Sequence, residues 1–282
     1  MVGNDFEGKG RLMMDMPKEV RDLFVEERAA KFLATVDDSG GVNVALVVTL
    51  QPVPEEREDR LIFGEFLMWK TKENLLADSR VGVAAVNTKL KAAALTGDFG
   101  GFETSGPYKD AMDLSPFMRY NAYSGVRSAG VVDVRDCGEM RSFMAGMVLD
   151  LIRVRIRRGE VSANGVIPPR LVREKFLRLT SIKGLAVIGE DGYPRVYPAL
   201  TVAAAGETGF VIRSSPYRRE IESAGMPCQA AMCVVTMDAM SYKVKGELSS
   251  LGGGSFLFRV KEVYNAMPPL AGELIPTPLR GM

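Results

Sequence analysis

Residues 17–49 read PKEVRDLFVEERAAKFLATVDDSGGVNVALVVT, and residues 169–201 read PRLVREKFLRLTSIKGLAVIGEDGYPRVYPALT. The two segments align without a gap at an offset of 169 − 17 = 152 residues and are identical at ten of 33 positions. Unrelated segments of this length would share about two identities at ordinary residue frequencies. The sequence therefore predicts a duplicated domain whose copies begin with the same unit. The identical pairs are Pro17/Pro169, Val20/Val172, Arg21/Arg173, Phe24/Phe176, Lys31/Lys183, Leu33/Leu185, Ala34/Ala186, Gly40/Gly192, Val44/Val196 and Thr49/Thr201.

The length and composition fit two globular domains. The chain has 282 residues, and we place the domains at residues 1–150, with a long insertion at 99–128, and at residues 151–282. The net charge of +1 gives no general reason to expect nucleic acid or an acidic membrane as a partner. No apolar run reaches the ~18 residues that span a bilayer, and the N-terminal segment lacks the apolar stretch of a secretory signal. We therefore expect a cytoplasmic protein.

The absence of histidine restricts the chemistry. The chain has no His and three Cys, which excludes Ser-His-Asp and Cys-His catalytic groups and His-ligated zinc or haem. We expect no metal site and no disulfide framework. Proton transfer would depend on Lys, Tyr, Cys, carboxylates, water or a cofactor. The chain is therefore a binding protein or an enzyme whose cofactor performs the difficult step.

The pattern of each half predicts a leading helix, about six antiparallel strands and one short helix after the third strand. Between the halves, the alternation of apolar and basic residues over 152–157 predicts a strand. Short strands joined by tight turns favour closure, so the predicted fold class is mainly β, a β-barrel with flanking helices in each half. In the first half we expect helices at 17–31 and 70–77, the latter with Thr71 as N-cap, and strands at 32–36, 42–50, 61–69, 80–87, 90–98 and 129–136.

Several segments, taken in order, resemble the FMN-binding split barrels of pyridoxamine 5′-phosphate oxidase and its relatives. They are FLATVDDSGGVNVALVV (32–48), LIFGEFLMW (61–69), KTKENLLADSRVGVAAVN (70–87) and LTGDF (95–99), with LAVIGEDGYPRVYPALTV (185–202), GFVIRSSPYRREI (209–221) and YKVKGEL (242–248) in the second half. Members of this family are typically homodimers that bind FMN in clefts between two barrels. The resemblance thus implies tandem split barrels that form a pseudo-dimer within one polypeptide, and it leaves a further homodimer open.

The resemblance also implies where the cofactor binds. In the family, a Ser or Thr with a nearby Lys or Arg holds the FMN phosphate at the turn after the third strand. The matching residues are Thr71 and Lys72, with Lys70 and Asn74 as neighbours. A helix N-terminus offers free backbone N–H groups and the positive end of the helix dipole, which suits a phosphate. The alternative is a solvated, capped helix start without a ligand.

The hairpin strand and the second half supply further candidates by the same resemblance. The strand over 44–49 would line the isoalloxazine ring, and Val47 and Thr49 are its candidates. A second phosphate would bind the corresponding turn of the second half, where Pro216 and Tyr217 depart from the family pattern. The candidates at that turn are Ser214, Ser215, Arg218 and Arg219.

The insertion and the cofactor define the expected function. A long loop inside a compact domain is often functional, so we expect a lid in which Arg119, Tyr120 or Tyr123 faces a small-molecule substrate. Packing of this loop on the other barrel is the alternative. The expected function is that of an FMN-dependent oxidoreductase, with NAD(P)H as an open second partner. A non-enzymatic flavin-binding or sensing module, and a deazaflavin- or haem-binding relative, stay as alternatives.

Overall fold

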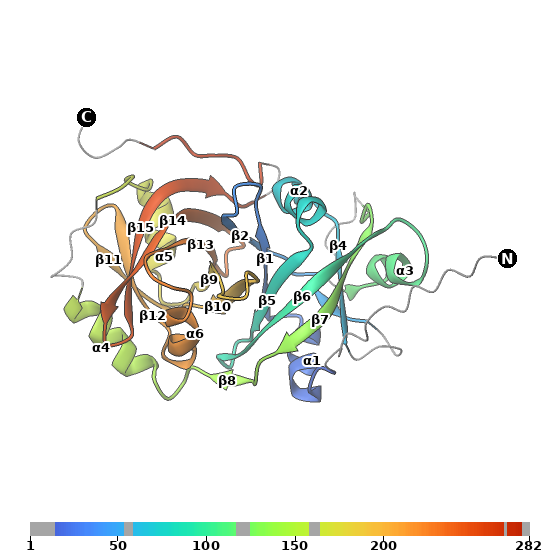
Figure 1. Ribbon diagram of the computed structural model, residues 1–282, viewed down its shortest axis with the longest axis horizontal. Coiled ribbons are helices and arrows are strands. Elements are labelled where there is room, and N and C mark those ends of the chain that lie inside the picture. The colour runs from blue at the N-terminus through green and yellow to red at the C-terminus, as the bar shows by residue number, and fades with distance from the viewer. Residues whose placement is uncertain (1–14, 54–58, 117–124, 158–163, 268–269, 278–282) are drawn as a thin grey trace, which may run out of the picture.

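The computed structural model describes residues 15–53, 59–116, 125–157, 164–267 and 270–277. They form two curled antiparallel sheets that pack side by side (Figure 1). The first sheet has the strand order β2-β1-β5-β6-β7-β4-β3, with β8 paired to β6. Its strands are β1 (Ala30–Val36), β2 (Val42–Leu46), β3 (Gln51–Pro52), β4 (Arg60–Gly64), β5 (Arg80–Val86), β6 (Lys91–Glu103), β7 (Ala129–Cys137) and β8 (Arg141–Ser142).

The second sheet repeats the first. Its order is β10-β9-β13-β14-β15-β12-β11, which is the first order with each strand replaced by its counterpart. The predicted duplication and the mainly β fold class are therefore confirmed. The strands are β9 (Ile182–Ile188), β10 (Pro194–Pro198), β11 (Thr201–Ala205), β12 (Gly209–Arg213), β13 (Cys228–Val235), β14 (Ser241–Gly252) and β15 (Ser255–Asn265).

The leading helices explain several of the repeated residues. α1 (Lys18–Val25) buries Val20 and Phe24, and α5 (Arg170–Leu177) buries Val172 and Phe176 at the same positions. The i, i+4 spacing places both apolar side chains of each helix on the face that packs against its sheet. Gly40 (φ 75°) and Gly192 (φ 78°) turn the two hairpins, and glycine adopts such positive φ values without a Cβ penalty.

The two sheets share one continuous core. Phe32 and Val44 of the first sheet pack in the same cluster as Leu185 and Val196 of the second. The approach is close enough that a Cβ on Gly184 would lie 2.9 Å from the Phe32 ring. Because these apolar faces bury each other, the two halves form one body, as expected for a pseudo-dimer.

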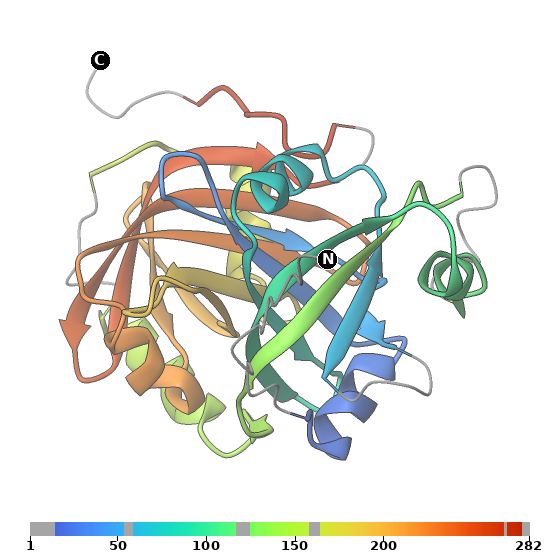
Figure 2. The same cartoon turned by 45° about the vertical axis from the view of Figure 1, so that its right-hand side comes forward.

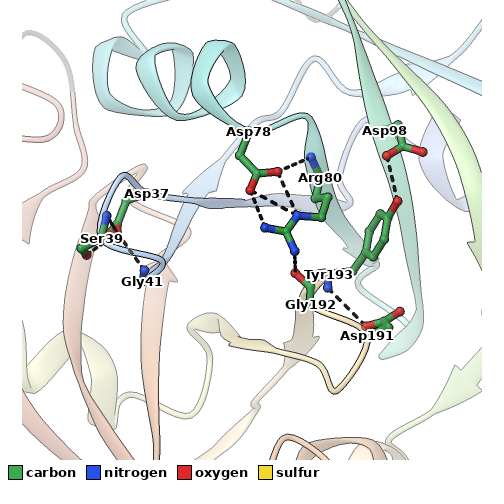
Figure 3. A network of polar contacts seen from close by, with 9 residues as sticks. All are labelled: Asp37, Ser39, Gly41, Asp78, Arg80, Asp98, Asp191, Gly192 and Tyr193. Carbon is green, nitrogen blue, oxygen red and sulfur yellow. Dashed lines mark hydrogen bonds and ion pairs between the residues drawn. The ribbon is translucent and has the colours of Figure 1, made fainter.

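A polar network ties the halves together beside this core (Figure 3). The Arg80 guanidinium is held by Asp78 and donates to the carbonyl oxygen of Gly192 at 2.8 Å. The Tyr193 hydroxyl donates to Asp98 at 2.9 Å from the opposite half. Charge-assisted contacts of this kind fix the angle between the two sheets, which apolar contacts alone do not specify.

Two helices depart from or add to the prediction. The segment predicted as a strand over 152–157 belongs to α4 (Met147–Arg157), because Asp150 and Val154 lie one turn apart on the buried face. α4 packs on the second sheet, where Val154 contacts the cluster around Ala203 and Val211. In the insertion, β6 continues to Glu103, and α3 (Pro107–Asp113) follows on the side of the first sheet that faces away from the second (Figures 1 and 2).

The third strand and its short helix also differ from the prediction. β4 ends at Gly64, and α2 begins at Trp69 rather than after Thr71. α2 (Trp69–Ala77) has Met68 as its N-cap, so Thr71 is the third residue of the helix and not its cap. In the second half the equivalent segment is a short 3₁₀ turn, η2 (Ser215–Tyr217), followed by α6 (Arg218–Glu222). In the part of the chain that the structure describes, no helix has the length and apolar character needed to span a bilayer.

Candidate functional site

A cavity of about 430 Å³ lies between the two halves at the N-terminus of α2. One wall is the segment 44–49, which contains the end of β2, and another is the segment 66–71, which leads into α2. The second half closes the cavity with Lys243 of β14, Asn265 at the end of β15 and the following segment. Volumes of about 300–1,000 Å³ with mostly apolar walls are typical of cofactor and small-molecule sites.

The α2 N-terminus gives the cavity a positive end. The N-cap Met68 makes no side-chain hydrogen bond to the helix, and the first helical backbone bond is donated by Lys72 to Met68. The N–H groups of residues 69–71 therefore precede the first intrahelical bond and lie at the positive end of the helix dipole. Lys70 and Thr71 line the cavity at this point. Lys70 makes a long ion pair with Glu73, with 3.6 Å between Nζ and Oε2.

Four of the six first-half candidates line this cavity: Val47, Thr49, Lys70 and Thr71. Val47 presents its side chain to the core and donates its backbone N–H to the Lys31 carbonyl oxygen at 2.8 Å. The Thr49 hydroxyl accepts from the Gly64 N–H at 3.0 Å, which holds the loop after β2 against the end of β4. The structure therefore brings together the strand and the helix turn that the sequence treated as separate candidates.

Lys72 and Asn74 have other partners. Lys72 Nζ donates to Glu65 Oε1 at 2.6 Å, and the Ser128 hydroxyl donates to the other oxygen of the same carboxylate at 2.5 Å. These contacts lower the pKa of Glu65 even though its burial works in the opposite direction. The Asn74 amide donates to the buried Thr35 hydroxyl at 2.9 Å. Both side chains anchor α2 to its own half, and neither lines the cavity.

Lys243 is a cavity residue that the sequence did not single out. Its Nζ donates to Asn43 Oδ1 of the other half at 2.6 Å and lies 5.0 Å from the centre of the Tyr264 ring. Burial lowers the pKa of Lys243 to about 8, and the nearby Lys245 and Lys70 charges contribute to the same shift. A signal was present in YKVKGEL, where Lys243 and Lys245 alternate with apolar residues on a predicted strand.

The segment after β15 covers the cavity. Ala271 and Gly272 line it, and the Gly272 N–H donates to the Asn265 carbonyl oxygen at 2.8 Å. The Asn265 N–H in turn donates to the Glu273 carbonyl oxygen at 2.9 Å. The Pro-rich composition of residues 265–282 gives no indication that this segment would fold back over the first half.

Trp69 stands at the edge of the same cavity. Its side chain is 48% exposed, and the Arg127 guanidinium lies 4.5 Å from the centre of a ring. This contact is a cation–π interaction at a site open to solvent. The lid candidates Arg119, Tyr120 and Tyr123 lie outside the described residues.

The corresponding turn of the second half is filled by the chain itself. Asp150 of α4 accepts from the Ser215 N–H at 3.1 Å and from the Ser215 hydroxyl at 2.6 Å. The buried Arg213 guanidinium donates to Asp150 Oδ1 at 2.8 Å, and the Ser214 hydroxyl donates to the Pro198 carbonyl oxygen at 2.8 Å. An internal carboxylate therefore takes the donors that a bound phosphate would need.

The two arginine candidates of this turn lie on the surface of α6. Arg218 is exposed and pairs with Glu222 at 3.0 Å, one turn along the same helix. Arg219 is also exposed, and its backbone carbonyl oxygen accepts from the Ser223 N–H at 2.9 Å. The second-half candidates thus do not share one cavity as Lys70 and Thr71 do.

No family model and no curated protein matches the sequence. Several solved structures are similar to parts of the chain. An FMN-binding protein from Syntrophomonas wolfei is similar over 45% of this chain and 86% of its own, with 19% identity and a TM-score of 0.38. A candidate pyridoxamine 5′-phosphate oxidase from Lactobacillus delbrueckii is similar over 45% of this chain and 94% of its own, with 19% identity and a TM-score of 0.32.

Each of these solved structures corresponds to about half of the chain. In this chain the two sheets of equivalent strand order form a tandem of two curled antiparallel units. The motility inhibitor MotI of Bacillus subtilis is similar over 83% of this chain and 87% of its own, with 7% identity and a TM-score of 0.27. The cavity at α2 lies between the two sheets.

Proposed function

We propose that the tandem split barrel binds one FMN in the cavity at the N-terminus of α2 and acts as a flavin-dependent oxidoreductase. The observation that carries the proposal is the cavity of about 430 Å³ with apolar walls and a cationic end. Such a cavity matches a flat apolar ring joined to a phosphate. The sequence resemblance to the FMN-binding split barrels supports the same assignment.

The residues present fit the phosphate at one end. The free N–H groups at the start of α2, the Thr71 hydroxyl and the Lys70 ammonium group are the donors for a phosphate there. Lys243 adds a second positive charge from the opposite barrel. The charges of Lys70 and Lys243 disfavour each other in the free protein, and a bound dianion relieves this repulsion.

The ring would lie along the segment 44–49. Backbone groups of this segment and the side chains of Leu67 and Met68 form a largely apolar wall. Such a wall excludes water from one face of a bound ring. Asn265 and the Gly272 region cover the cavity from the second barrel, so both halves of the chain contribute to one site.

When bound, FMN supplies the hydride or single-electron transfer. Among the described residues that line the cavity, the ionisable side chains are Lys70 and Lys243. Both are placed to neutralise an anion rather than to remove a proton from a substrate carbon. The role of the chain is therefore to bind, orient and shield the cofactor. NAD(P)H is the proposed reductant of the bound flavin, and a small molecule is the proposed substrate.

Titration separates this proposal from its alternatives. The fluorescence of FMN should fall when it binds the protein. FMN should also bind at least about tenfold more tightly than riboflavin, which lacks the phosphate. NADPH or NADH oxidation by the FMN-loaded protein would then establish an oxidoreductase. Binding of FMN without any such turnover favours the non-enzymatic flavin-binding module. Equal affinity for FMN and riboflavin contradicts the phosphate site at α2.

A further inference from the structure

A second cavity, of about 230 Å³, is lined by residues of both halves, among them Arg141 of β8 and Glu220 of α6. These two elements lie at the end of the interface opposite α2 (Figure 1). The second cavity is the counterpart of the first cavity with the two halves exchanged. The first cavity combines β2 with the ends of β14 and β15, whereas the second combines β10 with β6 and β7. Its lining includes Val196 of β10, which matches Val44 in the first cavity at the offset of 152 residues.

Aromatic side chains reduce this second cavity to about half the volume of the first. Tyr197 stands where the first half has Ala45, since 197 − 152 = 45. Tyr197 packs against Tyr217 of η2 with 5.1 Å between the ring centroids. Asp150 already takes the donors of the neighbouring turn. A flavin therefore has neither the space nor the phosphate site that the first cavity provides.

The hydroxyl groups of Tyr197 and Tyr217 are buried in this cavity, and each side chain is 3% exposed. Within the described residues neither hydroxyl has a hydrogen bond of good geometry, and the polar group that interacts with the Tyr197 hydroxyl is the Arg195 guanidinium. An unsatisfied buried hydroxyl costs about 1–3 kcal/mol, so such groups in native proteins usually have a function or an absent partner. Burial raises the pKa of both phenols, which keeps them protonated and able to donate at neutral pH.

Two guanidinium groups, Arg141 and Arg195, and two carboxylates, Glu220 and the exposed Asp136, line the cavity with these hydroxyls. The Arg195 guanidinium lies beside Tyr197 and donates to one carboxylate, that of Asp191, at 2.9 Å. Glu220, which also lines the cavity, is neutralised by an ion pair with Arg141. Arg141 in turn lies 4.8 Å from the centre of the Tyr217 ring. Among the described residues, the two phenols are thus the buried donors of this cavity without an acceptor, and Arg195 is the guanidinium beside them.

We propose that the second cavity is a separate binding site for a small organic carboxylate, held by the Tyr197 and Tyr217 hydroxyls and the Arg195 guanidinium. Its volume corresponds to roughly eight water molecules at ~30 Å³ each, which limits the ligand to about that many non-hydrogen atoms. The site differs from the flavin cavity in place, size and donors, so it does not depend on the proposed function.

Benzoate is a suitable probe, and benzamide is its neutral match in shape. Benzoate should raise the melting temperature of the protein in a saturable way, and benzamide should do so far less. The double variant Tyr197→Phe/Tyr217→Phe keeps both rings and removes both hydroxyls. Its affinity for benzoate should fall by at least about tenfold. Lys70→Ala, at the first cavity, should leave benzoate binding unchanged.

The same double variant tests the premise. Removing two unsatisfied hydroxyls should leave the ligand-free protein at least as stable as the wild type. A less stable variant would show that the hydroxyls have internal partners and would overturn the proposal. Absence of any benzoate response, an equal response to benzamide, or an unchanged response in the double Phe variant would overturn it as well.

Discussion

The two helix turns that face the barrel interface have the same place in the repeat and different contents. At the first turn, Lys70 and Thr71 line a cavity of about 430 Å³. At the second, Ser215 donates both its N–H and its hydroxyl to Asp150 of the same chain. The comparison shows that a duplicated site can be closed by one carboxylate from a connecting helix while the sheets around it stay the same.

The last residues of β4 and β12, Gly64 and Arg213, also differ between the two halves. Thr49 accepts from the Gly64 N–H, and its counterpart Thr201 pairs with Arg213, so Gly64 and Arg213 are equivalent. The guanidinium of Arg213 binds Asp150 and the Gly253 carbonyl oxygen, at 2.8 and 2.6 Å. Where the first half has no side chain, the second half has a buried ion pair that fixes α4 on its sheet.

Removing this carboxylate is the strongest way to break the comparison. Asp150→Ala leaves Arg213 buried without its anion, and the loss of one partner of a buried pair costs about 3–5 kcal/mol. Urea denaturation should show this loss in the free energy of unfolding. The matched control Asp136→Ala removes an exposed carboxylate and should change it by less than about 0.5 kcal/mol.

Anion rescue makes the same variant more informative. If Asp150 occupies the place of a phosphate, inorganic phosphate should raise the melting temperature of Asp150→Ala more than that of the wild type. An equal effect of phosphate on both proteins would show that the turn does not become an anion site when Asp150 is removed.

A second prediction concerns what the halves share. Lys31 and Lys183 are equivalent and fully buried, and burial lowers the pKa of each to about 7. Lys183 Nζ donates to the carbonyl oxygen of Arg178 at the end of α5, at 2.6 Å. Between pH 7 and 10 the unfolded chain holds protons that the folded lysines release. The free energy of unfolding should therefore rise with pH, by at most about 1.4 kcal/mol per unit for each lysine.

Methionine variants separate this contribution from other titrating groups. Lys31→Met and Lys183→Met should each lower the slope of unfolding free energy between pH 7.5 and 9.5, measured by urea denaturation. The double variant should lower it by the sum, since the two sites are in different barrels. A change of slope in one variant and none in the other would mean that the repeated lysines do not have equivalent surroundings.

The sequence predicted the parts of the fold that depend on local pattern. Phe24 and Phe176 pack at helical spacing, and Gly40 and Gly192 turn the hairpins. These features follow from propensity and periodicity within a few residues. The wrong prediction of a strand over 152–157 has a local cause as well. Alternating Ile, Val and Arg fits a strand, and it also fits a helix such as α4, in which Val154 is the buried residue of this segment.

The sequence could indicate cavity residues only where they are local. Lys70 and Thr71, which the resemblance pointed to at one contiguous turn, line the cavity. Lys243 also lines it, but its partner Asn43 lies 200 positions away in the chain. Asp150 closes the second turn from a connecting helix, 65 residues before Ser215. Such contacts depend on how the two barrels pack, and no periodicity in a single sequence specifies them.

The third prediction compares the two turns directly through FMN affinity. Lys70→Ala should weaken FMN binding by about tenfold, because a partly exposed charge–phosphate contact contributes roughly 1.4 kcal/mol. Arg218→Ala, the matched change at the second turn, should leave the affinity unchanged because Arg218 pairs with Glu222 on the surface. Isothermal titration calorimetry measures both, and a loss of affinity in Arg218→Ala would place a flavin site in the second half.

The smallest expected effect is a pH dependence that belongs to the first cavity. The pKa of Lys243 is lowered to about 8 in the free protein, mainly by burial. Above that pH the side chain is neutral and no longer attracts the phosphate, whose own second ionisation is complete above about pH 7. The affinity for FMN should therefore fall as pH rises from 7 to 9, by roughly fivefold. Lys243→Arg keeps its charge throughout this range and should give a flat profile.

A flat profile in the wild type, or a fall of equal size in Lys243→Arg, would mean that the charge at residue 243 does not hold the anion. The phosphate would then depend on the α2 turn alone.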